Sequence, residues 1–151
     1  MLEFEDESPV TEMSPEECWH LLRHAEVGRL ALSVRDDVDI FPVNFAVSEG
    51  TIYFRTSPGS KLAELTANPR VALEADRYDD ISAASVIVKG LAERVELQSE
   101  IDEADQLELR PWIPTLKYRW VRIVPTRVTG RRFTRAAEPD RYDVIDSGPY
   151  S

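Results

Sequence analysis

A short stretch in the middle of the chain carries the residue types that best suit an anion site. Residues 56–61 read TSPGSK, and a helix-like run, residues 62–67, follows directly. Backbone amides at the start of a helix point toward an anion, and the helix dipole favours negative charge there. Serine and threonine hydroxyls add hydrogen-bond donors, and lysine adds a positive charge. The stretch has the composition of a phosphate site, although a solvated loop with a surface lysine would show the same spacing.

Two predicted strands deliver this loop. Residues 40–47 and 51–56 are rich in β-branched and aromatic residues, and the turn sequence SEG at residues 48–50 separates them, which predicts a hairpin. The first strand is apolar on both faces and is therefore predicted to be buried on both sides. Asn44 is the exception within it. Because a buried amide needs hydrogen-bond partners, Asn44 either bonds to a neighbouring strand or faces a polar, planar ligand lying on the sheet.

The rest of the pattern predicts a mainly β fold (α+β). Residues 14–17 read SPEE, a capping box with proline at the first helical position, and open a helix that is expected to reach about Ala25. Six strands joined mostly by short turns indicate an antiparallel sheet closed into a small barrel. Gly90 is expected to mark a bulge or a barrel corner. The other predicted strands are residues 29–35, 70–75, 85–95 and 117–133, and the other helices are residues 62–67 and 98–109.

The domain organisation follows from charge and periodicity. One domain, residues 14–133, is expected between a loose acidic arm, residues 1–13, and a tail without clear periodicity, residues 134–151. Residues 3–17 hold seven acids and no base, whereas residues 115–137 hold one lysine, six arginines and no acid. These segments either meet, within one chain or across a dimer, or form ordinary solvated surface.

Composition argues against several classes of function. A net charge of −10 over 151 residues argues against a nucleic-acid partner. The single cysteine excludes an internal disulfide, and the acidic N-terminus and the lack of a long apolar run indicate a cytoplasmic protein without a membrane partner. His20 and His24 share a helix face, but Leu21 stands where a zinc protease motif requires glutamate, so no metal site is expected. Rossmann, complete P-loop and serine-hydrolase motifs are absent.

Six short motifs follow one another along the chain. They are VGRLA at residues 27–31, PVNF at 42–45, IYFRT at 52–56, GSKL at 59–62, NPRVA at 68–72 and VIVKGLAE at 86–93. In this order they resemble the flavin-binding split barrel of the pyridoxamine 5'-phosphate oxidase superfamily. The resemblance implies a six-stranded antiparallel split β-barrel, usually a homodimer, with FMN lying between the subunits and a small molecule as substrate.

The resemblance also implies where the phosphate of FMN binds. Ser60 and Lys61 match the positions that hold it, and Phe54 and Arg55 match the strand end beside it, next to Thr56 of the anion-binding stretch. The oxidase proper has further basic contacts in an Arg-x-Val-x-x-Lys stretch, where this chain reads FPVNFA. Both basic residues are therefore missing, and Arg55 is the candidate substitute for one of them.

The flavin ring has its own implied contacts. It would lie along Pro42, Val43, Asn44 and Phe45, and Ser85 matches a polar contact to the flavin on a later strand. The C-terminal substrate motif of the oxidase, an aromatic Glu-Phe-Trp run followed by Arg-Leu-His, is absent, and the chain reads VPTRVTGRRF in its place. Oxidation of pyridoxamine 5'-phosphate itself is therefore not expected.

The sequence thus predicts an FMN-binding oxidoreductase that acts on an unidentified small molecule. Three alternatives remain open. They are a reductase of the same fold that uses the deazaflavin F420, whose tail is also anionic, a flavin-binding carrier without turnover, and a purely structural barrel. No general acid or base stands out. Tyr53 and Tyr118 have hydroxyls that can donate protons, but a tyrosine in a barrel more often packs with its hydroxyl satisfied.

Overall fold

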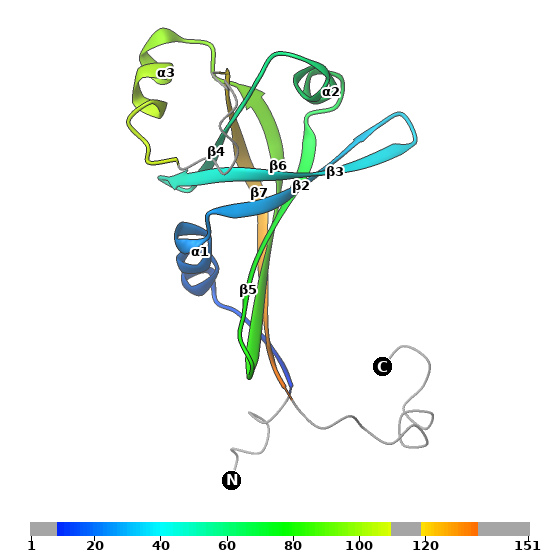
Figure 1. Ribbon diagram of the computed structural model, residues 1–151, viewed down its shortest axis with the longest axis vertical. Helices are drawn as coiled ribbons and strands as arrows, with labels where there is room; N and C mark the ends of the chain where they lie inside the picture. The colour runs from blue at the N-terminus through cyan, green and yellow to red at the C-terminus, as the bar shows by residue number, and fades with distance from the viewer. Residues whose placement is uncertain (1–8, 110–118, 136–151) are drawn as a thin grey trace.

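The computed structural model describes residues 9–109 and 119–135, which form one antiparallel sheet with three helices packed around it (Figure 1). The sheet order is β1-β7-β4-β3-β2-β5-β6, and β6 pairs with β7 as well. This additional pairing closes the six strands β2 to β7 into a ring. The elements in chain order are β1 (Val10–Glu12), α1 (Pro15–His24), β2 (Val27–Val34), β3 (Asp37–Ser48), β4 (Thr51–Thr56), α2 (Ser60–Ala67), β5 (Arg70–Tyr78), β6 (Ser82–Arg94), α3 (Gln98–Ala104) and β7 (Arg119–Thr134).

The ring is a split barrel because β7 is shared unevenly. One edge of β7 pairs with β6 along nearly its whole length. The other edge pairs with β4 near the start of β7 and with β1 near its end. The predicted six-stranded split barrel is therefore confirmed. The structure adds a seventh strand, because Val10–Glu12, which the sequence places in the acidic arm, pairs with residues 131–133.

A register shift marks the corner of the barrel. It falls between Lys89 and Gly90, and Gly90 lies opposite Pro125 on β7. The sequence predicts a bulge or a barrel corner at this glycine, and the structure places the glycine opposite the proline. A Cβ atom on Gly90 would collide with the backbone carbonyl of Val124, so only glycine lets the two strands approach here.

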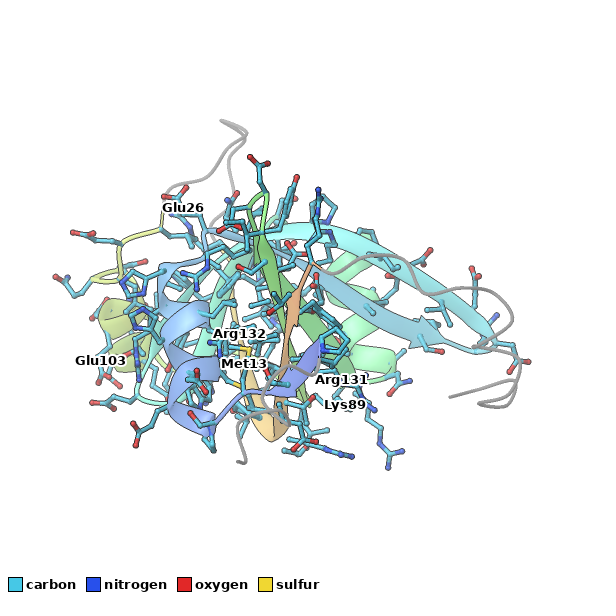
Figure 2. All side chains as sticks on the ribbon, turned by 90° about the horizontal axis from the view of Figure 1, so that it is seen from below. Met13, Glu26, Lys89, Glu103, Arg131 and Arg132 are labelled. Atoms are coloured by element: carbon cyan, nitrogen blue, oxygen red, sulfur yellow. The ribbon has the colours of Figure 1, made fainter. Side chains whose placement is uncertain are left out.

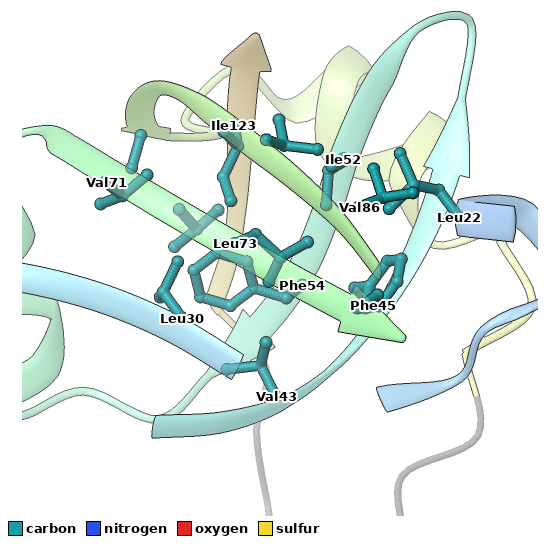
Figure 3. Close-up of a cluster of buried hydrophobic side chains, with 14 of the residues drawn as sticks. Leu22, Leu30, Val43, Phe45, Ile52, Phe54, Val71, Leu73, Val86 and Ile123 are labelled. Atoms are coloured by element: carbon teal, nitrogen blue, oxygen red, sulfur yellow. The ribbon is translucent and has the colours of Figure 1, made fainter. Parts of the chain in front are cut away.

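Alternation along the strands separates the core from the outer face. Val43 and Phe45 of β3 and Phe54 of β4 point into the barrel and are buried (Figure 3). The prediction that residues 40–47 are buried on both sides is wrong, because Ile40 is 66% exposed. Ile87, on the apolar run of β6, is likewise exposed. Successive side chains of a strand point to opposite faces, and the outer face is open at these positions.

Helix α1 covers the barrel as its capping box predicts. The Ser14 hydroxyl accepts a hydrogen bond from the Glu17 amide at 3.2 Å, and the Glu17 carboxylate accepts one from the Ser14 amide at 2.9 Å. The buried face of the helix includes Cys18, and burial raises the pKa of its thiol. A Cβ atom on Gly130 of β7 would lie 2.6 Å from the Cys18 sulfur, so this glycine permits the close approach of the helix.

Helix α3 ends earlier than predicted. The sequence predicts helix to residue 109, whereas the structure ends it at Ala104. The amide of Gln106 donates to the Glu103 carbonyl, and the amide of Leu107 donates to the Ala104 carbonyl. These bonds span three residues rather than four, which tightens the chain out of the α-helix.

The acidic and basic segments meet within one chain. Arg132 of β7 donates to the Glu17 carboxylate at 2.8 Å, and Glu12 of β1 lies opposite Arg131. Arg132 lies on the side of α1, whereas Arg131 projects on the other side of the strand (Figure 2). The charge pattern read from the sequence is thus realised, in part, as contacts that join α1 and β1 to β7.

These contacts make the stability of the protein depend on pH through Glu17. Hydrogen bonds from the Ser14 amide and from Arg132 lower the pKa of Glu17 from its ordinary value of 4.5 to about 2. A carboxylate with a lowered folded-state pKa stabilises the fold above its unfolded-state pKa and loses that contribution as pH falls. We expect the difference in unfolding free energy between wild type and Glu17→Gln to be largest above pH 4.5 and to shrink toward pH 2.

Urea denaturation at a series of pH values measures this difference. Glu16→Gln is the matched control, because Glu16 is exposed in the first turn of the same helix and the described structure gives it no hydrogen bond or ion pair. A difference for Glu17→Gln that stays constant from pH 6 to pH 2 would contradict the assigned contacts.

Candidate functional site

The predicted cofactor residues on β3 and β4 lie on two opposite faces. Val43, Phe45 and Phe54 have relative exposures of 7%, 3% and 0% and pack in the barrel core. Their side chains therefore leave no atom for a ligand on the outer face. Pro42 and Asn44 alternate with them and lie on the outer side of β3. The sequence motif PVNF thus contributes to the core and to the outer surface in turn.

Asn44 has a hydrogen-bond partner at the edge of the neighbouring strand. Its side-chain nitrogen donates to the backbone carbonyl of Glu26 at 3.3 Å, just before β2 begins. The amide of Phe45 donates to the same carbonyl. Of the two roles considered for Asn44, the structure shows the first, a hydrogen bond to an adjacent strand end. The side chain is half-buried and lies on the outer face.

The loop after β4 presents the start of α2 without a side-chain cap. Gly59 occupies the N-cap position with φ of +152°, which favours glycine, and no side chain there accepts from the first helical amides. Thr56 is buried, and its hydroxyl donates to the Ser57 carbonyl at 3.3 Å, so it is bonded within the loop. Ser60 and Lys61 form the first turn of α2, and their side chains lie outside the described part of the structure. The backbone geometry is that of an anion cradle.

Arg55, at the end of β4, brings an unneutralised cation next to this loop. Its guanidinium lies over the Trp120 ring, 5.4 Å from the centroid. Arg29, Arg122 and Arg132 each have a carboxylate partner. Among the described residues Arg55 has no such partner, so its charge remains available to an anion.

Two buried polar atoms flank the loop and have no hydrogen-bond partner among the described residues. One is Nε of Arg55, a donor on β4, and the other is Oε2 of Glu64, an acceptor on α2. Buried polar groups are nearly always satisfied in folded proteins, and leaving one unpaired is costly. An orphaned donor beside an uncapped helix start fits the oxygen of a bound phosphate or carboxylate, so the residues present suit an anionic cofactor.

Ser85 lies apart from the loop, in a polar network on the outer face. Its hydroxyl donates to Oε2 of Glu74 at 2.8 Å, while Arg29 donates to Oε1 of the same carboxylate at 2.9 Å. Strands β2 and β5 separate β6 from β3, so Ser85 does not adjoin Pro42 or Asn44 within the sheet. Sequence reasoning missed Arg29 and Glu74, because their meeting depends on the pairing of β2 with β5, which no local pattern encodes.

A separate cavity lies between the end of α1 and β3. It has a volume of about 410 Å³, and its lining includes Arg23, His24, Glu26 and Ala46. Nδ1 of His24 lies 2.8 Å from the carbonyl of His20, which can only accept a hydrogen bond. In neutral His24 the proton therefore resides on Nδ1, and Nε2 remains an acceptor. In the sequence these histidines were weighed only as metal ligands. Among the described residues, no group of three side chains that could bind a metal ion occurs.

The fold defines the class of the protein, a split barrel, in which the start of α2 has no side-chain cap and its backbone geometry suits an anionic group. Residues 14–132 match the pyridoxamine 5'-phosphate oxidase family, and the chain belongs to that family. The resemblance read from the six motifs is therefore confirmed. Among the described residues, no helix combines the length and the apolar character needed to cross a membrane.

Solved structures with the same fold include flavin-binding proteins. A Corynebacterium glutamicum protein with a provisional pyridoxamine 5'-phosphate oxidase assignment is 47% identical and covers 87% of this chain and 98% of its own, with a TM-score of 0.79. The FAD-binding protein of Mycobacterium smegmatis is 41% identical, covers 83% of this chain and 99% of its own, and has a TM-score of 0.73. A FAD-binding protein of Mesorhizobium loti is 27% identical, covers 82% and 97%, and has a TM-score of 0.72. The family to which the chain belongs thus has flavin-binding neighbours.

Proposed function

We propose that the protein binds FMN without a covalent bond and uses it for redox chemistry on a small molecule. The observation that carries this proposal is the uncapped start of α2 beside Arg55, whose buried Nε has no partner among the described residues. The phosphate of FMN would occupy this cradle, with Lys61 and Arg55 as its cationic contacts. A bound flavin supplies the electron transfer, and the chain binds, orients and shields it.

The remaining assignments follow from the placement of residues on the outer face. Pro42 and Asn44 provide the surface along which the flavin ring would lie. Ser85 belongs to the polar network with Glu74, so we propose that it reaches the flavin only through that network. The cavity beside β3, which His24 helps to line, is the proposed place for the small-molecule substrate.

A second candidate function, a reductase dependent on F420, has one observation in its favour. Lys89 and Arg127 lie directly opposite each other on β6 and β7, and both are exposed. Like charges in register destabilise a sheet unless an anion lies nearby. Neither residue has an acidic partner among those described, so they would suit the polyanionic tail of F420. A flavin-binding carrier without turnover is the third candidate, and reoxidation of the reduced protein by a defined acceptor distinguishes it from an enzyme.

A twofold homodimer is part of the proposal, and the outer face supports it. A shallow hollow of about 260 Å³ on this face is floored by Ala31 and Ala72 and bordered by Val38 and Lys89. Monomers rarely expose apolar patches of more than roughly 300–600 Å², and a twofold contact is the commonest way to cover one. Exposed apolar side chains on this face are Val38, Ile40, Ile87, Leu91 and Val124.

The phosphate assignment predicts the effect of removing its cations. Lys61→Ala and Arg55→Ala should each weaken FMN binding about ten- to a hundred-fold, because each removes a charge-assisted contact. Quenching of FMN fluorescence during titration measures the affinity. Arg77→Ala is the control, since it removes an exposed arginine at the far end of β5. Affinities equal to that of wild type in both variants would refute the cradle.

The choice of cofactor predicts a preference for FMN over F420. A compact cradle with Lys61 and Arg55 suits one terminal phosphate, whereas a longer polyanion needs a more extended basic surface. Competition between the two cofactors measures the preference, with FAD as a third competitor. The double variant Lys89→Ala/Arg127→Ala should weaken the binding of FMN less than the binding of F420. If F420 binds more tightly than FMN, and this double variant weakens it, the second candidate function replaces the first.

The dimer predicts a concentration-dependent mass that the flavin shifts. A ligand that binds only the dimer must stabilise it, so FMN should lower the concentration at which subunits separate. Sedimentation across a dilution series, with and without FMN, measures this. Ile40→Asp should yield monomers, whereas Leu97→Asp should not, although the two side chains are 66% and 65% exposed. A wild-type monomer at micromolar concentration that binds one FMN per chain would exclude the shared site.

A further inference from the structure

We propose that Trp120 is a positioning residue that holds Arg55 ready for the anionic group of the cofactor, and that Asp105 fixes Trp120 in turn. The proposal rests on the proposed function, in which Arg55 is a phosphate contact. It assigns a role to α3, which stands apart from the loop and from α2 in the fold.

The indole of Trp120 is held in one orientation from two sides. Its Nε1 donates to Oδ1 of Asp105, directly after α3, at 2.7 Å. The Tyr53 ring meets it edge-on, with centroids 6.4 Å apart and an interplanar angle of 79°. The tryptophan is 4% exposed and forms a small second core with Val95 and Ala104. A buried ring with a bonded nitrogen and an edge contact has little freedom to turn.

Arg55 lies on the face of this fixed ring. It is directly opposite Trp120 in the pairing of β4 with β7, and its guanidinium carbon is 5.4 Å from the ring centroid. The π face attracts the cation without neutralising its charge, and it restricts the rotation of the guanidinium. The arginine is therefore positioned but still available to an anion.

Arg122, two residues after Trp120 on the same face of β7, contrasts with Arg55 because carboxylates neutralise it. Arg122 donates to Glu93 at 2.6 Å and to Glu100 at 2.8 Å, and these hydrogen bonds raise the pKa of its guanidinium. Glu100 belongs to α3, so one short helix fixes two sites in different ways. At Arg122 it supplies a carboxylate that neutralises the arginine. At Arg55 its extension supplies a carboxylate that bonds instead to the tryptophan beneath the arginine.

Substitutions that separate ring, charge and bulk test this role. Trp120→Leu removes the π face, and Trp120→Phe keeps a ring. We expect Trp120→Leu to weaken FMN binding about three- to tenfold, as a lost cation–π contact would, and Trp120→Phe to restore most of the affinity. In an Arg55→Ala background, Trp120→Leu should have no further effect, because the group that it positions is gone. Trp19→Leu, which removes a partly buried tryptophan on α1, is the control for loss of an indole.

The salt dependence of FMN affinity distinguishes a positioning role from a purely structural one. If Trp120 only stabilised the fold, its substitution would leave this salt dependence unchanged. Arg55→Ala should reduce the slope of affinity against salt concentration, since it removes the ionic contact. Trp120→Leu should reduce the same slope by a smaller amount, since it keeps the charge of Arg55 but no longer holds the guanidinium in place. If Trp120→Leu does not fold, Asp105→Leu tests the proposal instead, because it removes the hydrogen bond to the indole nitrogen and keeps the ring. Unchanged FMN affinity and an unchanged salt slope in Asp105→Leu would overturn the proposal.

The outcomes also separate this inference from the proposed function. Equal losses from Trp120→Leu in the wild-type and Arg55→Ala backgrounds would overturn the positioning role while leaving Arg55 as a phosphate contact. Unchanged FMN affinity in Arg55→Ala would overturn both the phosphate contact and the positioning role that depends on it.

Discussion

The pairing of β7 with three other strands is the constraint on which the rest of the structure depends. Its edge with β6 closes the barrel, and its opposite edge pairs first with β4 and later with β1. The pairing of β7 with β4 places Trp120 opposite Arg55, beside the loop that leads to α2. Near the end of β7 that pairs with β1, Arg132 reaches Glu17 and Gly130 lies beneath Cys18, so that α1 packs closely. One strand thus joins the proposed cofactor site to the packing of the N-terminal helix.

A barrel of this size divides every strand into a core face and an outer face. The side chains of Phe45 and Phe54 are used for packing, and only the residues between them remain for binding. The motif PVNF therefore combines two side chains that pack in the barrel core with two that lie on the outer face. The outer face then carries two kinds of feature, exposed apolar residues and a polar network around Glu74, which suit burial against a second copy and contact with a polar ring respectively.

Local signals in the sequence predicted most of the elements but not their partners. The SPEE capping box, the turn before Thr51 and the glycine at position 90 each have a short-range physical cause, and the structure confirms all three. The seventh strand escaped prediction because three residues in an acidic segment carry no periodicity. The exposure of Ile40 escaped it too, since a strand that is apolar on both faces does not reveal which face is covered. The contacts of Glu74 and Trp120 require the register between distant strands, which no local rule supplies.

The distribution of charge bears on how an acidic protein would hold the proposed anionic cofactor. At a net charge of −10 the chain as a whole repels an anion, and salt screens that repulsion beyond roughly 10 Å. Attraction must therefore come from groups in direct contact, and several arginines of the barrel, Arg29, Arg122 and Arg132, are paired with carboxylates. Arg55 instead lies over the ring of Trp120 and keeps its charge. Beside it, the uncapped amides at the start of α2 can donate hydrogen bonds to an anion. Selectivity at this site then follows from geometry rather than from net charge, because an anion gains affinity there only if its oxygens reach the helix amides and Arg55.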